Sequence, residues 1–522
     1  MALRRSTRGS MGRRRLMAGG AAAGLVVAAP AIVRAKARPT ITTGLQFGDP
    51  SPTGMLAWAM SDRPARLMLE WDTRASRATA RKIAGPLLTA DNAFAAQVDI
   101  DGLPPGETVV VRAWLEDADG NAGEALDGEF RTTPVAGRAR DVTIAWSGDQ
   151  IGQGYGIDVE RGGMKIFSAM AALAPDLFVH SGDQIYADSP LVPERRLADG
   201  TIWRNLLTPA KSKVAESLDE YRGNYVYNFL DPHFRDFHAR VPKLAQWDDH
   251  DVRNNWYPGR LLDEARYTEK RLDVLAARAR RAFFEMNPVR GARERIYRAI
   301  PYGDMVEVFL LDGRSHRGTN PGALARERGA DTAYFGDAQI AWLKDALRRS
   351  RATWKIIACD QPIGLMNPDG ANAVDGIANG IPELGGREFE VAELLSFMKA
   401  ERIYNTVWVT AEVHHAAAYR YDPVGATGFN DFDPFWEFVA GPLHASCLVR
   451  GLLDPTFGPD ERFLHAPAYE AGGQPPNGAF QSFGAVAIDA DTRVMTVRLH
   501  GAGGEELYSV ELEPRRLTAG RP

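Results

Sequence analysis

From residue 142 onward, apolar runs of strand length recur, and each of them ends in a cluster of polar side chains. Residues 142–146 lead into Ser147-Gly148-Asp149-Gln150, and residues 176–180 lead into Ser181-Gly182-Asp183-Gln184-Ile185-Tyr186. Residues 163–173, between these two units, have a helical pattern. The order strand, helix, strand predicts an α/β fold, and the carboxyl ends of its parallel strands form the edge at which such sheets bind ligands.

The same pattern continues toward the C-terminus. Further strands with their polar ends are expected at residues 305–311 with 312–317, 354–358 with 359–361, and 406–410 with 411–415, and a helix near 339–344. Residues 193–237 and 261–284 have a helical pattern, so we expect them to form excursions that wall the ligand-binding edge. Residues 484–489 and 493–499 predict a hairpin that completes a second sheet.

Residues 39–134 have an all-β pattern instead. Strand-length runs occupy 54–60 and 65–71, and side chains alternate between apolar and other positions over 109–115. This pattern resembles a fibronectin type III-like sandwich. We therefore expect an N-terminal β-sandwich domain over residues 38–136, followed by a catalytic domain over 137–516. The sandwich is interpreted as a structural cap on the catalytic domain, and the alternative is a substrate-binding module.

The N-terminal residues 1–37 are typical of a secretory signal peptide. Arginines at positions 4, 5, 8 and 13–15 precede a mildly apolar run, 16–29, that is too short to span a membrane stably. The arginine pair favours the twin-arginine route, so the expected partner during export is the twin-arginine translocase and the expected location is periplasmic or secreted. A disordered basic tail is the alternative.

Composition excludes other classes of protein. The formal net charge of −5 provides no basic footprint for nucleic acid. The two cysteines, Cys359 and Cys447, are too few for a disulfide framework or a thiolate zinc site; either one disulfide or two buried thiols would fit, and we expect the thiols. No later stretch predicts a transmembrane segment in the mature protein.

The densest polar cluster is Trp247-Asp248-Asp249-His250-Asp251-Val252-Arg253-Asn254-Asn255. An isolated cluster of this kind could be a charged surface turn. It is, however, one of several at expected strand ends, which deliver Asp149, then Asp183 with Tyr186, then Asp249 with His250, and finally Glu412 with His414. This order resembles the calcineurin-like metallophosphoesterases, and in particular their PhoD-like alkaline phosphatase and phosphodiesterase branch.

The resemblance extends over nearly the whole expected mature chain. The shared features are a β-sandwich before the catalytic domain and the motifs Gly182-Asp183-Gln184-Ile185-Tyr186, Trp247-Asp248-Asp249-His250-Asp251 with Asn254-Asn255, Asp312-Gly313-Arg314 with Arg317, and Glu412-Val413-His414. It implies a two-sheet metallophosphoesterase sandwich flanked by helices and preceded by the fibronectin-like domain. It also implies hydrolysis of phosphate esters.

Ester hydrolysis by this class of enzyme needs metal ions about 3.5–4 Å apart, which generate a hydroxide and clamp the phosphate. We predict that Asp183 bridges two ions and that Asp149 and Tyr186 complete the shell of one of them. Asp249, Asn255 and Glu412 are then the expected ligands of the neighbouring ion or ions.

The remaining candidates carry nitrogen donors. His250 and His414 are predicted to be catalytic, although acid–base groups and metal ligands are not distinguished by the sequence. We predict a catalytic role for Arg314 and a substrate-binding role for Arg317, because their planar donor forks suit phosphate. Pairing with Asp312 inside the fold is the alternative for both arginines.

Two or three metal ions are expected, and oxygen-rich ligation favours hard ions. The phenol of Tyr186 favours a trivalent ion, and the family resemblance implies iron with calcium. In many members of the family, however, a cysteine stands where this chain has Asp149 and an aspartate where it has Glu412. Manganese or zinc are therefore alternatives.

The resulting hypothesis is an exported, metal-dependent phosphoesterase of the alkaline phosphatase or phosphodiesterase type that uses in-line attack by a metal-bound hydroxide. Its substrate would be a small-molecule or polymeric phosphate ester. The alternative hypothesis is a non-catalytic, metal-containing protein that binds phosphorylated ligands.

Overall fold

Two mixed β-sheets, packed face to face, form the centre of the protein. The computed structural model describes residues 37–76, 80–468, 475–476 and 478–515. The first sheet has nine strands in the order β22 (Glu506–Leu512), β21 (Met495–Gly501), β20 (Ser482–Ile488), β8 (Val142–Ser147), β9 (Leu177–His180), β12 (Lys243–Ala245), β1 (Gln46–Ser51), β2 (Gly54–Met60) and β5 (Ala95–Asp101). Its central strands β8, β9, β12 and β1 pair in parallel.

The second sheet has seven strands. Their order is β13 (Arg298–Tyr302), β14 (Val306–Leu310), β15 (Trp354–Ala358), β16 (Thr406–Thr410), β18 (Phe435–Val439), β17 (Ala416–Tyr421) and β19 (Pro459–His465). Strands β14, β15, β16 and β18 pair in parallel. Each sheet therefore presents the carboxyl ends of several parallel strands at one edge.

The two faces of each sheet are buried in different hydrophobic cores. In β9, Leu177 and Val179 belong to the core that also includes Val308 and Val409 of the second sheet, whereas Phe178 belongs to the core that includes helical residues. Because successive side chains of a strand point to opposite faces, this division follows from the geometry of the strand. It explains why the central strands are apolar runs without alternation, since both of their faces are covered.

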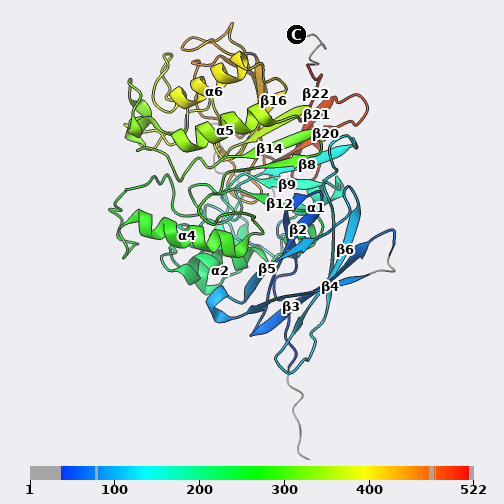
Figure 1. Cartoon of the computed structure of the whole chain (residues 1–522). Helices are drawn as coiled ribbons and strands as arrows, with labels where there is room; N and C mark the ends of the chain where they lie inside the picture. Colours follow the sequence, from blue (N-terminus) through cyan, green and yellow to red (C-terminus); the bar gives the residue numbers. More distant parts are fainter. Residues whose placement is uncertain (1–36, 77–79, 469–474, 477, 516–522) are drawn as a thin grey trace, which may run out of the picture. The chain divides into compact units, whose positions relative to one another are not determined.

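Helices cover the outer faces of the sheets, as Figure 1 shows. Helices α1 (Ile166–Ala172), α2 (Leu218–Asn228), α3 (Pro232–His238) and α4 (Leu272–Met286) contribute to the core against the first sheet, and α5 (Asp337–Arg349) and α6 (Glu388–Ala400) to the core against the second. Short 3₁₀ turns are η1 (Ala90–Asn92), η2 (Pro209–Lys211), η3 (Pro321–Leu324) and η4 (Ala330–Thr332).

Helix α2 begins where its sequence supplies a reciprocal cap. The Ser217 hydroxyl accepts a hydrogen bond from the Glu220 backbone N–H at 3.3 Å, and the Glu220 carboxylate accepts one from the Ser217 N–H at 2.8 Å. Helix α4 instead depends on an apolar stripe, with Leu275, Ala279 and Phe283 buried on one face. The two helices lie side by side and contact each other.

The N-terminal part is all-β, as the sequence predicts. A four-stranded sheet consists of β4 (Arg81–Leu88), β3 (Ala65–Thr73), β6 (Thr108–Glu116) and β7 (Leu126–Arg131). Its apolar face shares a core with residues of β1, β2 and β5, including Phe47, Met55 and Val98. The latter three strands also extend the first catalytic sheet, because β1 pairs with β12 through Gly48 and Lys243.

Two expected elements differ from the sequence interpretation. Within the region expected to be helical, β10 (Glu194–Arg196) and β11 (Ile202–Arg204) form a two-stranded hairpin, whose turn contains Asp199 and Gly200. The hairpin expected to complete a second sheet, β20 with β21, instead joins the first sheet through pairing of β20 with β8. Nearly every residue of β20 is buried, so its apolar sequence pattern did not indicate which strand it would pair with.

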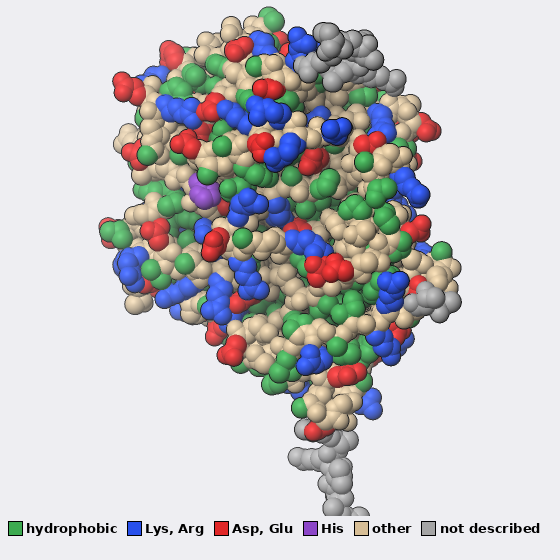
Figure 2. All heavy atoms as spheres, viewed as in Figure 1, with side chains coloured by type: hydrophobic (Ala, Val, Ile, Leu, Met, Phe, Trp, Pro, Cys, Tyr) green, Lys and Arg blue, Asp and Glu red, His purple; other side chains and the backbone are tan. Residues whose placement is uncertain are grey.

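Further expectations concern the cysteines, membrane-spanning helices, the charged surface and the N-terminus. Cys359 and Cys447 are both free and buried, so the interpretation as thiols is confirmed. Among the described residues, the structure contains no helix with the length and apolarity needed to cross a membrane. The face in Figure 2 mixes Lys and Arg with Asp and Glu side chains. The signal peptide expected over residues 1–37 lies outside the described residues, apart from Ala37.

Candidate metal centre

Loops that follow strands of both sheets converge on a single site. Backbone hydrogen bonds join the loops after β8 and β9: Gln150 N–H donates to the Asp183 carbonyl at 2.9 Å, and Asp149 N–H to the Gly182 carbonyl at 3.3 Å. The loop after β9 is joined to the loop after β12 by the Ala187 N–H, which donates to the His250 carbonyl at 2.9 Å. Backbone hydrogen bonds thus connect the expected strand-end clusters after β8, β9 and β12.

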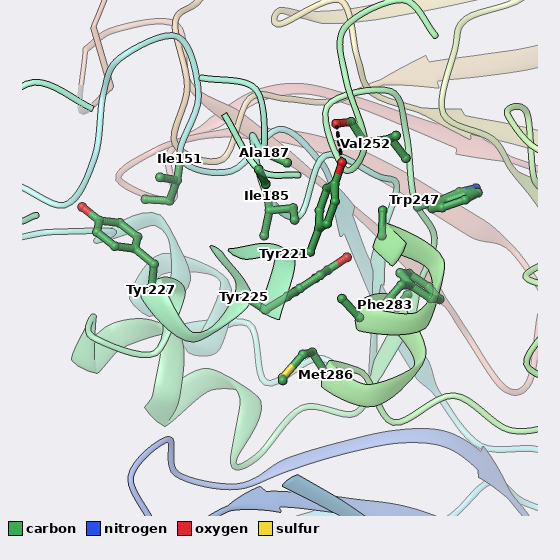
Figure 3. Close-up of a cluster of buried hydrophobic side chains, with 14 of the residues drawn as sticks. Ile151, Ile185, Ala187, Tyr221, Tyr225, Tyr227, Trp247, Val252, Phe283 and Met286 are labelled. Carbon is green, nitrogen blue, oxygen red and sulfur yellow. Dashed lines mark hydrogen bonds between the residues drawn. The ribbon is translucent and has the colours of Figure 1, made fainter. Parts of the chain in front are cut away.

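Apolar residues between the polar ones anchor these loops. Figure 3 shows Ile151, Ile185 and Val252 packed in the same cluster as the helical residues Tyr221 and Phe283. All five side chains are buried, with exposed fractions of 0%. The Tyr221 hydroxyl also donates a hydrogen bond to the Val252 carbonyl at 3.4 Å. Each loop therefore fixes its polar side chains by burying an apolar neighbour.

The acidic and histidine side chains form three overlapping groups. Within each group, one donor atom per residue lies within 4.8 Å of the others. The groups are Asp149, Asp183, Glu412 and His414; Asp183, Asp249 and His250; and Asp183, Asp248, Asp249 and Glu412. Asp183 is common to all three groups, which is the position that a bridging carboxylate would occupy between neighbouring ions.

The donor set fits cations. Asp149 Oδ2 and Asp183 Oδ2 are buried and accept no hydrogen bond from any described residue. Burial, reinforced by the negative charge of Asp249, raises the pKa values of Asp149, Asp183 and Glu412 well above the usual range for carboxyls. Buried charges of this kind are normally paired or bound to metals, so ions would relieve the repulsion within the cluster.

Several of these residues adopt left-handed backbone conformations. The φ angles are 65° for Asp149, 50° for Asp183, 54° for Asn255, 61° for Glu412 and 56° for His414. Such conformations cost free energy for residues with a β-carbon and cluster at functional sites. Four of these five residues, all except Asn255, belong to the groups of donor atoms described above.

His250 forms a dyad with Asp188. Its Nδ1 lies 2.7 Å from Asp188 Oδ1, and its ring stacks on Tyr186 with a centroid distance of 4.2 Å. Burial alone would lower the pKa of His250, but the charges of Asp188 and Asp249 outweigh burial and raise the pKa to about 9. In the metal-free protein these charges therefore favour the protonated form of His250, which is able to donate a proton.

His414 has the opposite electrostatic character. Its Nδ1 is hydrogen-bonded to the Ser446 carbonyl, and its Nε2 lies 2.9 Å from the Tyr186 hydroxyl and 3.9 Å from Asp149 Oδ1. Burial is the main cause that lowers the pKa of His414 to about 3. A neutral imidazole that donates from Nδ1 leaves Nε2 as an acceptor, which is the form that binds metals.

The two candidate arginines form ion pairs with buried aspartates. Arg314 has an exposed fraction of 0% and pairs with Asp248 at 2.5 Å and Asp375 at 2.7 Å. Arg317 pairs with Asp375 at 2.8 Å. Asp312, the alternative partner considered above, accepts the backbone N–H of Arg314 at 3.1 Å. Catalysis by Arg314 and substrate binding by Arg317 therefore remain predictions. The contacts that both arginines make in the structure are with carboxylates, which they orient.

Asn255 lies next to the cluster, because its backbone N–H donates to Asp249 Oδ2 at 2.6 Å. All the predicted oxygen donors are thereby placed around Asp183 or its immediate neighbours. Sequence analysis did not select Asp188, Asp248 or Asp375 as site residues. Asp248 stood within a quoted motif and Asp188 just beyond one, whereas Asp375 belongs to a long loop without any strand pattern.

Fold and site together define a metallophosphatase-like class of protein: two packed sheets with carboxylate and histidine loops at one edge. Residues 145–499 match the family model described as PhoD-like phosphatase, and residues 27–134 match that described as PhoD-like phosphatase, N-terminal domain. The chain belongs to the PhoD-like phosphatase family.

Individual relatives agree with this family. Alkaline phosphatase D of Bacillus subtilis (strain 168) is 25% identical over 338 residues, covering 62% of this chain and 53% of the Bacillus protein. The match thus spans about half of that relative's length. A solved structure of PhoD has a TM-score of 0.67 at 17% identity, covering 92% of this chain and 93% of its own.

A more distant neighbour shares the fold. Purple acid phosphatase PPD1 from yellow lupin (Lupinus luteus) seeds has a TM-score of 0.53 at 12% identity, covering 91% of this chain and 74% of its own. The two-sheet architecture with a preceding β-domain is therefore shared with structures of phosphatases.

Proposed function

We propose that this protein hydrolyses phosphate esters, as a phosphomonoesterase, a phosphodiesterase or both, at the cluster centred on Asp183. The observation that carries the proposal is that Asp183 belongs to all three groups of donor atoms that approach within 4.8 Å. Membership of a phosphatase family supports the reaction class. Similarity to the Bacillus protein, an alkaline phosphatase, supports an ester substrate.

Two or three metal ions would be held by residues of this cluster. Asp149 and His414 form one group with Asp183, Tyr186 contacts His414, and Asp249 belongs to the other two groups. Glu412 is shared between the group of Asp149 and a group of Asp249. When bound, the ions would make a nucleophile available at neutral pH and neutralise charge on the phosphoryl oxygens. The donors are oxygen and imidazole nitrogen, which suits iron with calcium and equally manganese or zinc.

The protein's own groups have distinct proposed roles. His250, protonated because its pKa is raised to about 9 against burial by Asp188 and Asp249, would donate a proton to the leaving oxygen. Asp188 keeps its ring in place through the 2.7 Å hydrogen bond to Nδ1. Neutral His414 would contribute Nε2 as a ligand. The ion pair with Arg314 would hold Asp248 in place within the acidic cluster.

Export is part of the proposal. The arginine-rich N-terminus and the apolar run after it support transport by the twin-arginine translocase to the periplasm or the medium. Fractionation of cells that produce the full chain tests this location. Recovery of the mature protein only from the cytoplasm would contradict it.

The direct test of the reaction is the substitution Asp183→Asn, with Asp236→Asn on the exposed face of α3 as the matched control. Loss of the shared carboxylate charge should lower hydrolysis of p-nitrophenyl phosphate and bis-p-nitrophenyl phosphate by at least about 100-fold, since metals and transition state depend on it. Chelation should abolish the activity of both the parent protein and the control.

Elemental analysis of the same samples separates the alternatives. A parent protein that contains metal but releases no phosphate from a broad ester panel would favour the non-catalytic binding protein. Near-normal turnover by Asp183→Asn would remove the assignment of the site.

A further inference from the structure

Side chains of one loop, residues 366–376, form hydrogen bonds with the side chains of two predicted metal ligands. We propose that this positioning loop orients Glu412 and Asn255, so that retention of metal by the centre depends on it. The inference rests on the proposed metal centre. It assigns positioning roles to Asn367 and Asp369.

Glu412 is held through one of its two oxygens. Asn367 Nδ2 and Gln361 Nε2 both donate to Glu412 Oε1, each at 3.2 Å. Asn367 Nδ2 also approaches Gln361 Oε1 at 3.3 Å, which links the two amides. Because both donors use Oε1, Oε2 is the oxygen left to bind a cation. Glu412 is longer than aspartate by one methylene, so its carboxylate needs such restraint to keep a single position.

Asn255 is held through its amide nitrogen. Its Nδ2 donates to Asp369 Oδ1 at 2.9 Å, and the other Asp369 oxygen accepts Asn320 Nδ2 at 2.8 Å. Asn320 Nδ2 also donates to the Asn255 backbone carbonyl at 3.0 Å. With Nδ2 committed to Asp369, Asn255 Oδ1 is the side-chain atom available as a ligand. Asp369 thus decides which end of the amide is free.

A buried arginine holds the backbone of the loop in place. The buried guanidinium of Arg387 donates from Nη1 to three consecutive carbonyls, those of Val374 at 3.1 Å, Asp375 at 2.5 Å and Gly376 at 3.0 Å. The turn is closed by the Asp369 N–H, which donates to the Ala373 carbonyl at 2.9 Å. A rigid support is what a residue needs in order to orient a ligand rather than merely follow it.

The other side of the centre has different supports. His414 is fixed through Nδ1 by the Ser446 carbonyl, and Asp149 by the backbone of its own and the neighbouring loops. Within the described part of the chain, these supports come from segments other than the positioning loop. Glu412 nevertheless shares a group of donor atoms with Asp149 and His414, so disturbing the loop should weaken metal binding through Glu412 and Asn255 while these other supports stay in place.

The test uses Asp369→Asn and Asn367→Ala, with Asn372→Ala as the control. Asn372 is exposed and lies in the same loop. The full-length protein is dialysed against graded EDTA, and bound metals per chain are measured by elemental analysis. In both test variants, bound metal should leave at an EDTA concentration about 10–100-fold lower than in the parent and the control.

The possible outcomes separate the inference from the proposed function. Parent protein without bound metal would refute the metal centre itself. Metal in the parent, with retention in both folded variants equal to that of the parent and the control, would refute the positioning role alone. Circular dichroism and cooperative thermal unfolding identify a variant that fails to fold; if Asp369→Asn does so, retention by Asn367→Ala decides the question.

Discussion

Buried carboxyls at the centre make the stability of the metal-free protein dependent on pH. Burial and the neighbouring negative charges raise the pKa values of Asp149, Asp183, Asp248 and Glu412 well above their ordinary range. The folded state therefore binds more protons than the unfolded state at pH values above about 4. The stability that these protons provide is present at low pH and is lost as the pH rises through the folded-state pKa values.

We expect this loss to appear when metal is removed. As the pH rises above about 4, the melting temperature of the EDTA-treated protein should fall more steeply than that of the metal-loaded protein, because bound cations replace the protons. His250 acts in the same direction, since its pKa is raised to about 9 despite burial, by Asp188 and Asp249. Differential scanning calorimetry measures the gap, and a gap independent of pH would contradict this account.

At the scale of elements, the turn after β18 limits how much space the predicted ligands have. A β-carbon on Gly441 would lie 2.5 Å from Asp149 Oδ2 and 3.7 Å from the Ala411 β-carbon. The atom that must move is thus the ligand atom itself. This turn and the loop after β8 are also joined by the Leu443 N–H, which donates to the Gly148 carbonyl at 2.8 Å.

The substitution Gly441→Ala should therefore weaken metal binding by about 10-fold or more while the fold persists. Isothermal titration calorimetry of the metal-free protein measures the affinity. Gly329→Ala is the control, since a β-carbon there meets nothing within 4 Å. Equal affinities of the two variants would show that Asp149 relaxes without loss of a ligand.

At the scale of the whole molecule, a buried ion pair joins the N-terminal strands to the second sheet. Arg298 of β13 donates to Asp49 of β1 through Nε at 2.8 Å and Nη2 at 2.7 Å. The exposed fractions of the two side chains are 9% and 0%. A second arginine, Arg290, pairs with Asp99 at the exposed surface of the same region.

Removal of the buried charge should be far more costly than removal of the exposed one. Asp49→Asn leaves the Arg298 charge without its partner and should reduce the free energy of unfolding by about 3–5 kcal/mol. Asp99→Asn should reduce it by less than about 1 kcal/mol. Urea denaturation followed by fluorescence compares them. Similar losses in the two variants would mean that the buried pair does not fasten the N-terminal strands.

Much of the centre could be predicted because its signals are local. The polar ends of β8, β9, β12 and β16 follow apolar runs directly, so their residue types and order were visible in the chain. Asn367, Asp369 and Asp375 carried no such signal, because their loop is anchored by Arg387, a residue that precedes α6, rather than by a strand. Asp188 could be recognised only through its contact with His250.

The sequence by itself determined the strand-length runs, the all-β start of the chain and the identity of the polar residues at the strand ends, since these depend on periodicity and composition over a few residues. Only the tertiary structure decided that β20 pairs with β8, that β1 extends the first sheet and that Asp183 lies at the common point of three groups of donors. The physical reason is that strand pairing and loop convergence depend on contacts between residues far apart in the chain, and a buried strand has nearly the same apolar pattern whichever neighbour it joins.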